Sequence, residues 1–396
     1  MVRTTLKEHL RPLWIILSNR WGGPEQVAVS DLVEMAHAEI SMNLICIEGS
    51  PVHAAAMRHP HIKVRAIKEE PRSWFDFSFV RFLKNTIKEF DANLVHVNDE
   101  SLLWYLYPGL RNLPHVSVVV SRYSTDEASF ADIFRRIWLR RIDYVVVLSS
   151  HIKNRVMRRL RVPERKIKVI NLGLDFTRFD PSKHNGTSIR KSWGVDADTI
   201  VIGSVGRLVP EVGQDTFLKA AASLMKHSKW KFKFAVIGED PLVSSEEYLV
   251  ELRELAKQFR IEDHVVFGSV ADNLPEIMSA FDVFVMPGSE EVPGLGALEA
   301  LAMERPVVLS RVAGAEDIVG DKEEFGRLVR AEDAFDLQQK IYELLQVAER
   351  RKEMGEKGRV HVLKNFDKST RFQRSFDVYD KCMKRRHRLN DERERE

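Results

Sequence analysis

The sequence is poor in cysteine and has no long apolar segment. Its 396 residues include two cysteines, Cys46 in the apolar stretch NLICIEG and Cys382 in a basic stretch near the C-terminus. The placement of these two cysteines predicts neither a disulfide framework nor a zinc site. A reducing, cytoplasmic setting is therefore expected. No run approaches the roughly 20 apolar residues that a membrane-spanning helix needs. The stretch Leu13–Leu17 is too short for a signal peptide and predicts a buried strand.

A large excess of one charge sign is also missing, because the net charge is only +3. The charge is nevertheless uneven: residues 1–175 hold 26 Lys and Arg against 19 Asp and Glu, net +7, and the rest hold 35 against 39, net −4. The basic run within Phe134–Lys168 is typical of a solvated helix face. Its aromatic neighbours offer an alternative, a peripheral contact with anionic lipid at the inner face of a membrane. No nucleic-acid-binding module accompanies the charge, so nucleic acid is not an expected partner.

What the chain does have is enough apolar material for two cores. With 44% hydrophobic and 30% charged residues, a chain of this length is expected to form two domains. Continuous apolar runs alternate with amphipathic stretches, such as residues 215–227, where Phe217, Leu218, Ala221, Leu224 and Met225 fall on one helical stripe. This pattern predicts an α/β fold with two doubly wound, Rossmann-like domains. The runs expected as strands are LWIIL, MNLICIE, IKVRAI, NLVHV, VSVVV, DYVVVLS, KIKVINLG, TIVIGSVG, FKFAVIG, HVVFGSV, VFVMP and RPVVLS.

Several segments in a fixed order carry a resemblance to a known family. They are WGGPEQVAVSDL, DANLVHVND, RIDYVVVLSSHIK, VINLGLDFTRFDP, IGSVGRLVPEVGQDTFLKAAASL, VFGSVADNLPEIMSAFDVFVMPGSEEVPGLGALEALAMERPVVLSRVAGAEDIV and GRLV. With these segments the chain resembles glycosyltransferase family 4, also described as glycosyl transferases group 1, along nearly its whole length. The resemblance implies a GT-B fold, in which two Rossmann-like domains face each other across a cleft, and a retaining mechanism.

The expected domain boundaries follow from this resemblance and from a junction rich in turn formers at residues 170–188. Residues 1–175 are expected to form the N-terminal, acceptor-side domain. Residues 176–365 are expected to form the C-terminal, nucleotide-sugar-binding domain. A C-terminal helix in residues 366–396 is expected to pack back on the N-terminal domain and to end in a charged tail. Because ligands of such folds bind at the carboxyl ends of strands, the site is expected in the interdomain cleft.

The segment PGSEEVPGLGALEALAMERPVVLS holds two glutamates on either side of a glycine-bearing turn. The free amides of a helix's first turn attract anions, and glycine lets a phosphate approach the backbone. The resemblance implies that the amides of Gly294 and Leu295 meet the donor diphosphate and that Glu299 accepts hydrogen bonds from the ribose. It also implies that Glu291 reaches the hydroxyl groups of the transferred sugar. The alternative is a pair of glutamates on a solvated helix end.

Arg207 follows the strand TIVIGSVG, where a guanidinium group can clamp phosphate oxygens. Family members normally add a lysine a few residues later, but this chain has Val212 there. Fixed cations stabilise the charge that builds on a leaving diphosphate, and the loss of one costs on the order of several kcal/mol of transition-state stabilisation.

Two N-terminal loops supply the remaining candidates. After VSVVV the family usually has a histidine near the reacting sugar, and Tyr123 stands there in this chain. Tyrosine donates a hydrogen bond but carries no positive charge. Gly22 and Gly23 precede a helix and allow close backbone approach to a ligand. The resemblance gives this loop a role at the diphosphate and acceptor side of the cleft, and a plain tight turn is the alternative.

Two further patterns are assigned no role in ligand binding. The acidic pair in Asp196–Asp198 imitates a metal-binding motif, but it precedes a buried strand, and the resemblance implies catalysis without a metal. His96 follows an apolar strand and is interpreted as a structural or cleft-edge histidine.

The expected function is that of a retaining hexosyltransferase acting in polysaccharide, lipopolysaccharide or other glycoconjugate synthesis. It would move a sugar from a UDP- or GDP-linked donor to a hydroxyl group of a glycan or lipid-linked acceptor, with no cofactor. Val212 and Tyr123 motivate an alternative, a weakened or inactive GT-B scaffold that binds a nucleotide or a partner. A sugar-nucleotide epimerase is a second alternative, because some epimerases share this fold.

Overall fold

The protein forms two compact units. A computed structural model describes residues 9–19, 23–71, 76–122, 141–160, 162–238, 246–269, 273–289, 295–312 and 314–395. Unit 1 comprises Met1–Gly173 and Lys368–Glu396, and unit 2 comprises Leu174–Asp367. The chain therefore leaves unit 1 after Gly173 and returns to it at Lys368.

Unit 1 is built on a seven-stranded parallel sheet with the order β3-β2-β1-β4-β5-β6-β7. The order reverses between β1 and β4, as in a doubly wound fold. The strands are β1 (Pro12–Ile16), β2 (Met42–Ile47), β3 (Ile62–Ile67), β4 (Leu94–Val97), β5 (Ser117–Arg122), β6 (Tyr144–Val147) and β7 (Ile167–Val169). The helices are α2 (Gly23–His37), α3 (Pro51–Ala56), α4 (Phe77–Glu89), α5 (Leu103–Gly109), α7 (Ser150–Leu160) and α16 (Lys368–Arg395).

Unit 2 is built on a six-stranded parallel sheet with the order β10-β9-β8-β11-β12-β13. Here the order reverses between β8 and β11. The strands are β8 (Thr199–Gly206), β9 (Lys231–Gly238), β10 (Val265–Ser269), β11 (Val283–Met286), β12 (Val307–Ser310) and β13 (Gly326–Val329). The helices are α8 (Thr187–Ser192), α9 (Gln214–His227), α10 (Glu246–Phe259), α11 (Leu274–Ala280), α12 (Leu295–Ala302), α13 (Ala315–Val319), α14 (Ala334–Leu345) and α15 (Ala348–Asn365).

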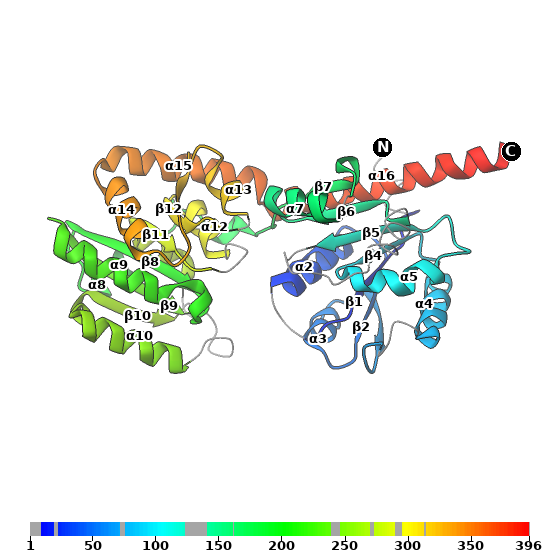
Figure 1. Ribbon diagram of the computed structural model, residues 1–396, viewed down its shortest axis with the longest axis horizontal. Helices are drawn as coiled ribbons and strands as arrows, with labels where there is room; N and C mark the ends of the chain where they lie inside the picture. Colours follow the sequence, from blue (N-terminus) through cyan, green and yellow to red (C-terminus); the bar gives the residue numbers. More distant parts are fainter. Residues whose placement is uncertain are drawn as a thin grey trace. The chain divides into compact units, whose positions relative to one another are not determined.

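The apolar runs of the sequence form the buried strands. All five residues of β1 and all six of β2 are buried, as expected of parallel strands that helices cover on both faces. In α9 the expected stripe is confirmed, since Phe217, Leu218 and Leu224 are fully buried in the core of unit 2. These features confirm the predicted α/β class with two doubly wound sheets (Figure 1).

The long C-terminal helix α16 belongs to unit 1, where it packs on α2 and β5 (Figure 1). Its buried side chains include Phe376, Val378, Tyr379 and Cys382. No helix among the described residues is both long and apolar enough to cross a membrane.

Candidate functional site

The residues proposed to bind a donor lie around the point in unit 2 where the strand order reverses. Arg207 directly follows β8, and the segment that contains Pro287 and Gly288 directly follows β11. Because β8 and β11 are parallel neighbours, their carboxyl ends meet at one edge of the sheet. Open α/β sheets bind ligands in the crevice at this point.

The loops that follow β8 and β11 are in direct backbone contact. After β8 a short 3-10 helix, Pro210–Val212, ends at Gly213, whose φ is 84°. A Cβ atom on Gly213 would lie 2.6 Å from the amide nitrogen of Gly288, and one on Gly288 would overlap the carbonyl oxygen of Glu211. Two glycines therefore let the loops meet without intervening side chains, and the positive φ of Gly213 favours glycine independently.

The helix α12 begins over the same edge. A Cβ atom on Gly296, in its first turn, would lie 3.0 Å from the carbonyl oxygen of Val205 and 3.2 Å from the Phe284 ring, so the helix start packs directly on β8 and β11. Every α12 residue is buried except Leu295 and Glu299, which share a face because they are four positions apart. The expected placement of Glu299 inside the helix and of Leu295 at its start is therefore observed.

Arg207 is held through its backbone by a residue that the sequence did not single out. The side-chain amide of Gln214 donates to the carbonyl oxygen of Arg207 at 2.8 Å, and Gln214 is buried. A glutamine at the start of an amphipathic helix resembles any solvated polar residue, so no pattern marked it. It fixes the turn that carries the guanidinium group out of β8.

Val212 is 2% exposed and packs toward the end of β8, where a Cβ atom on Gly206 would lie 3.2 Å from its Cγ1 atom. The side chain that replaces the expected lysine is therefore part of the core beneath the loop. It places no charge at this edge.

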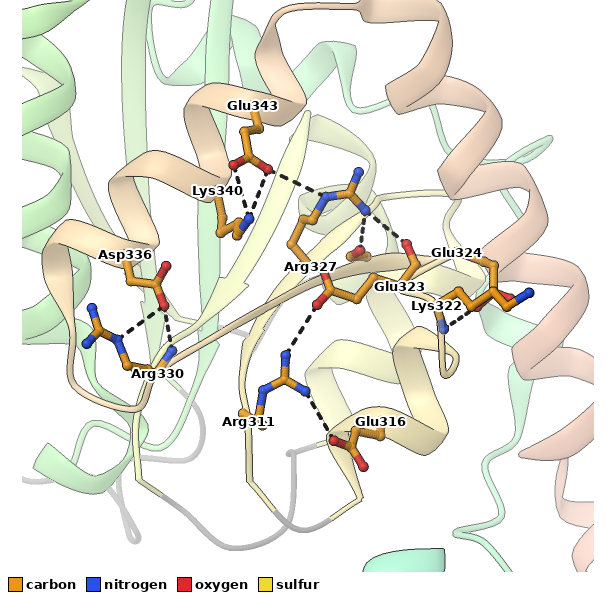
Figure 2. Close-up of polar contacts among 11 residues, drawn as sticks. Arg311, Glu316, Lys322, Glu323, Glu324, Arg327, Arg330, Asp336, Lys340 and Glu343 are labelled. Carbon is orange, nitrogen blue, oxygen red and sulfur yellow. Dashed lines mark hydrogen bonds and ion pairs between the residues drawn. The ribbon is translucent and has the colours of Figure 1, made fainter.

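In unit 2, Arg311 and Arg330 also stand at the carboxyl ends of strands, and Figure 2 shows Arg311 beside Glu316 and Glu323 and Arg330 beside Asp336. Arg311 follows β12 and lies 3.1 Å from Oε1 of Glu316 and 3.3 Å from Oε1 of Glu323. Arg330 follows β13 and lies 2.8 Å from Oδ2 of Asp333. In this arrangement neither guanidinium group substitutes for the cation missing at Val212.

In unit 1 the carboxyl ends of β1 and β4 also lie at a reversal of strand order. Gly23 begins α2, and the hydroxyl of Ser18, which follows β1, donates to Oε1 of Glu25 in the first turn of α2 at 2.8 Å. Both polar atoms of the Asn98 carboxamide, at the end of β4, are buried and have no hydrogen-bond partner among the described residues. Such a group gains a hydrogen bond when a polar ligand reaches it.

His96 lies in the core of unit 1, with hydrogen bonds at both ring nitrogens, to Tyr379 and to Ser121. Burial, with a smaller contribution from the charge of Arg371, lowers the pKa of His96 to about 3. The ring is therefore neutral at physiological pH, and its place in the core agrees with the structural interpretation.

Four of the candidate residues, Tyr123, Gly22, Glu291 and Gly294, lie outside the described residues, as does the aromatic part of Phe134–Lys168. The Asp196–Asp198 motif lies before β8, at the opposite edge of the sheet from Arg207, where Asp196 pairs with Lys231 at 3.8 Å. The metal-like motif is therefore remote from the strand ends described above.

Comparison with known proteins gives matches over both units. A family model described as Glycosyltransferase Family 4 matches residues 21–178, and one described as Glycosyl transferases group 1 matches residues 186–361. A GDP-mannose-dependent alpha-(1-6)-phosphatidylinositol monomannoside mannosyltransferase of Mycolicibacterium smegmatis is 30% identical over 302 residues, 73% of this chain and 76% of that protein. Matches to two further relatives cover about half of those proteins, 51% and 53%.

Solved structures show the same fold. A glycosyltransferase from Rickettsia africae aligns with a TM-score of 0.80 at 16% identity, covering 95% of this chain and 99% of that one. HepE from Anabaena, in complex with UDP, aligns with a TM-score of 0.78 at 19% identity, covering 94% and 100%. The predicted family resemblance and GT-B fold are confirmed. The transferase matches do not favour the epimerase alternative.

Proposed function

Because the chain belongs to the group 1 and family 4 glycosyltransferases, we propose that it transfers a hexose, with retention of configuration, from a nucleoside diphosphate donor. The observation that carries this proposal is the convergence of Arg207, the first turn of α12 and Glu299 at the reversal point of one sheet. A guanidinium group and free helix amides suit a diphosphate, and a carboxylate suits a ribose diol. The UDP bound to HepE and the GDP-mannose dependence of the mycobacterial relative support a donor of this class.

In the proposed reaction the bond between the sugar C1 and the donor phosphate oxygen breaks, and the diphosphate leaves with the electron pair. The acceptor oxygen bonds to C1 on the same face, and its proton passes to a phosphate oxygen of the leaving group. No metal or cofactor takes part. Arg207 and the amides of α12 stabilise the negative charge that develops on the diphosphate, and Glu291 holds the sugar hydroxyls.

The acceptor is proposed to be a hydroxyl group of a glycan or of a lipid-linked saccharide, bound at the strand ends of unit 1. The Asn98 carboxamide, which has no hydrogen-bond partner among the described residues, supports this placement, because a carboxamide both donates to and accepts from hydroxyl groups. Tyr123 and the loop at Gly22 and Gly23 complete the proposed acceptor side.

A membrane surface is proposed to lie beside this acceptor side. Burial and the nearby charges of Lys381 on α16 and Lys153 on α7 lower the pKa of Lys168 in the edge strand β7, so three lysines lie near one another, although Lys153 is paired with Glu164 at 2.6 Å. Such a cluster attracts anionic lipid head groups. Peripheral association at the inner face of a membrane would place the enzyme next to a lipid-linked acceptor.

A screen of UDP-, GDP- and ADP-linked hexoses by thermal shift and by turnover tests the proposal, because a bound donor raises the melting temperature whether or not transfer follows. Arg207→Ala and Glu299→Ala are each expected to lower kcat/KM about tenfold or more. Arg311→Ala, which removes an exposed, paired arginine from the same edge, serves as the control. Wild-type kinetics in both site variants would refute the assignment.

The second candidate function, a nucleotide-binding scaffold with weak or no transfer, is motivated by the buried apolar side chain of Val212. It predicts a thermal shift with a nucleotide but negligible turnover with every donor. The two readouts of the same screen therefore separate the two functions.

A further inference from the structure

Arg371, in the first turn of α16, makes a buried, forked ion pair. Its Nε lies 2.5 Å from Oδ1 of Asp31, and its Nη2 lies 2.6 Å from Oδ2 of the same carboxylate. The side chains of Arg371 and Asp31 are 5% and 8% exposed. The bidentate arrangement fixes both the direction and the rotation of the guanidinium plane.

The same guanidinium group also binds the segment that leaves unit 1. Nη1 donates to the carbonyl oxygen of Ile170 at 2.9 Å and to that of Asn171 at 2.6 Å. The neighbouring Arg374 donates to Oδ1 of Asn171 at 3.2 Å. The returning helix is therefore bonded to the outgoing chain at the unit boundary.

Gly173, the last residue of unit 1 before the crossing, packs against the same helix turn. A Cβ atom there would lie 2.7 Å from Cδ of Arg371 and 3.1 Å from the Cα atom of Lys368. Any side chain at this position would push the outgoing segment away from α16 or displace Arg371.

Unit 2 joins the two crossing segments on its own side of the boundary. The amide of Leu174 donates to the carbonyl oxygen of Phe366 at 2.8 Å, and Leu174 forms a parallel bridge with Asp367. Between the contacts at Asn171 and Arg371 and those at Leu174 and Asp367, only residues 172–173 and 368–370 connect the units.

Asp31 links these contacts to the proposed acceptor side of unit 1. It lies on α2, the helix that follows β1 and begins at Gly23. A buried ion pair seldom stabilises a fold more than a well-packed apolar pair would. We therefore expect the four hydrogen bonds of this guanidinium group to orient α2 and the outgoing segment more than they stabilise the fold.

We propose that Arg371 and Asp31 are positioning residues for glycosyl transfer. Together they hold α2 in a fixed place relative to the outgoing segment that ends at Gly173, and the proposed acceptor side of unit 1 depends on that orientation. This inference rests on the proposed transferase function. It assigns neither residue a contact with the substrate.

The test uses the full-length protein with Arg371→Lys, which keeps the charge but loses the fork, and with Asp31→Asn. The control is Asp380→Asn, which breaks an exposed pair with Lys384 on the same helix. Each variant is examined by circular dichroism, by calorimetric titration with the donor that the screen identifies, and by steady-state kinetics. Arg371→Lys and Asp31→Asn are expected to keep the donor Kd within about twofold of wild type, since Arg207 and Glu299 lie in unit 2, but to lose about tenfold or more in kcat. Asp380→Asn is expected to match wild type.

Gly173→Ala supplies the same test without any change of charge, so the inference stays testable if Arg371→Lys does not fold. A wild-type kcat in the folded variants would overturn the inference. A parallel loss of donor affinity would overturn it too, since that is the signature of general damage.

Hydrogen exchange separates this inference from the proposed function. If the wild type neither binds a donor nor transfers a sugar, the proposed function fails. The contacts of Arg371 with Asp31, Ile170 and Asn171 still predict faster exchange around residues 170–174 and 366–371 in Arg371→Lys than in Asp380→Asn. Unchanged exchange in both segments would overturn the positioning role of Arg371 and Asp31.

Discussion

The hydroxyl oxygen of Tyr379 lies 2.5 Å from Nδ1 of His96, although 283 positions separate the two residues in the chain. The second ring nitrogen of His96 lies 2.7 Å from Oγ of Ser121, and the ring centroid lies 4.0 Å from that of Trp14. One neutral imidazole therefore joins the C-terminal helix α16 to β4 and to the end of β5. Ser121 stands two residues before the candidate Tyr123, so the network holds the end of β5 that precedes it in the chain.

Acid is expected to destabilise unit 1 through His96. Burial, and secondarily Arg371, lowers the pKa of His96 from 6.5 to about 3. Between these values the unfolded chain binds a proton that the folded protein does not. The free energy of unfolding should therefore fall as the pH drops from 6.5 towards 3, with this residue contributing about 1.4 kcal/mol per pH unit. Urea unfolding at a series of pH values measures the slope.

The variant His96→Gln cannot titrate in this range, and we expect a shallower dependence of its unfolding free energy on pH, together with lower stability at neutral pH. His151→Gln, at an exposed position of α7, is the control and should keep the wild-type slope. An unchanged slope in His96→Gln would show that other groups govern acid unfolding.

Val212→Lys is expected to raise donor turnover. The stem of the lysine would occupy the core position that Val212 fills beneath the loop after β8, and its ammonium group would reach out of the core as a cation near the proposed diphosphate site. Overpacking is expected to cost about 1–3 kcal/mol of stability. We expect kcat/KM for the donor to rise about tenfold or more, measured by product formation.

Val212→Met is the matched control, because it has an unbranched apolar side chain without the charge. Equal gains in both variants would show that loop packing, and not the cation, limits the reaction. Ordinary wild-type turnover with no gain in Val212→Lys would remove the reason for the scaffold alternative.

Gly203→Ala is expected to destabilise unit 2. Gly203 lies within β8, and a Cβ atom there would overlap the ring of Phe281, which is fully buried. Overpacking of this kind costs about 1–3 kcal/mol, so the melting temperature of unit 2 should drop. Adding Phe281→Leu should restore part of the loss. Gly109→Ala, where the nearest atom would lie at 3.7 Å, should leave stability near wild type. Calorimetry that finds Gly203→Ala equally stable would contradict the packing described for β8.

Flotation with phosphatidylglycerol-containing vesicles tests the proposed membrane surface. We expect binding at low salt that weakens at physiological salt, because electrostatic attraction to the surface is screened. The double variant Lys168→Glu with Lys381→Glu should lose it, whereas Lys226→Glu with Lys229→Glu, an equal charge change in unit 2, should not. If the wild-type protein does not bind the vesicles at low salt, the proposed membrane surface is refuted.

The fold was largely predictable because many of the buried parallel strands are continuous apolar runs, and each of β1–β12 falls on a segment that the sequence marks as a strand. The run Leu13–Leu17 appears as β1, shifted by one residue to Pro12–Ile16. The exception is β13, which has four residues, begins with glycine and carries Arg327. Its position depends on pairing with β12 and not on its own composition, so no local pattern marked it as a strand.

The placement of site residues was predictable only where the chain's topology decides it. Arg207 and Glu299 are 92 positions apart, yet both belong at one sheet edge, because the carboxyl ends of parallel strands point the same way. The pair of Asp31 and Arg371 could not be predicted, because 340 positions separate its members. Arg371 looked like one cation among many in a basic C-terminal stretch. Only the returning path of α16 reveals its buried partner.

That returning path sets an order of assembly during synthesis. Unit 2 is continuous in sequence from Leu174 to Asp367, whereas unit 1 is completed by its last segment, Lys368–Glu396. Until the ribosome has released α16, the nascent unit 1 has no Tyr379 for His96 and no Arg371 for Asp31. Unit 2 can fold during that interval, while unit 1 still lacks the helix that supplies these partners. The half of the protein whose synthesis starts first is therefore the half whose packing is completed last.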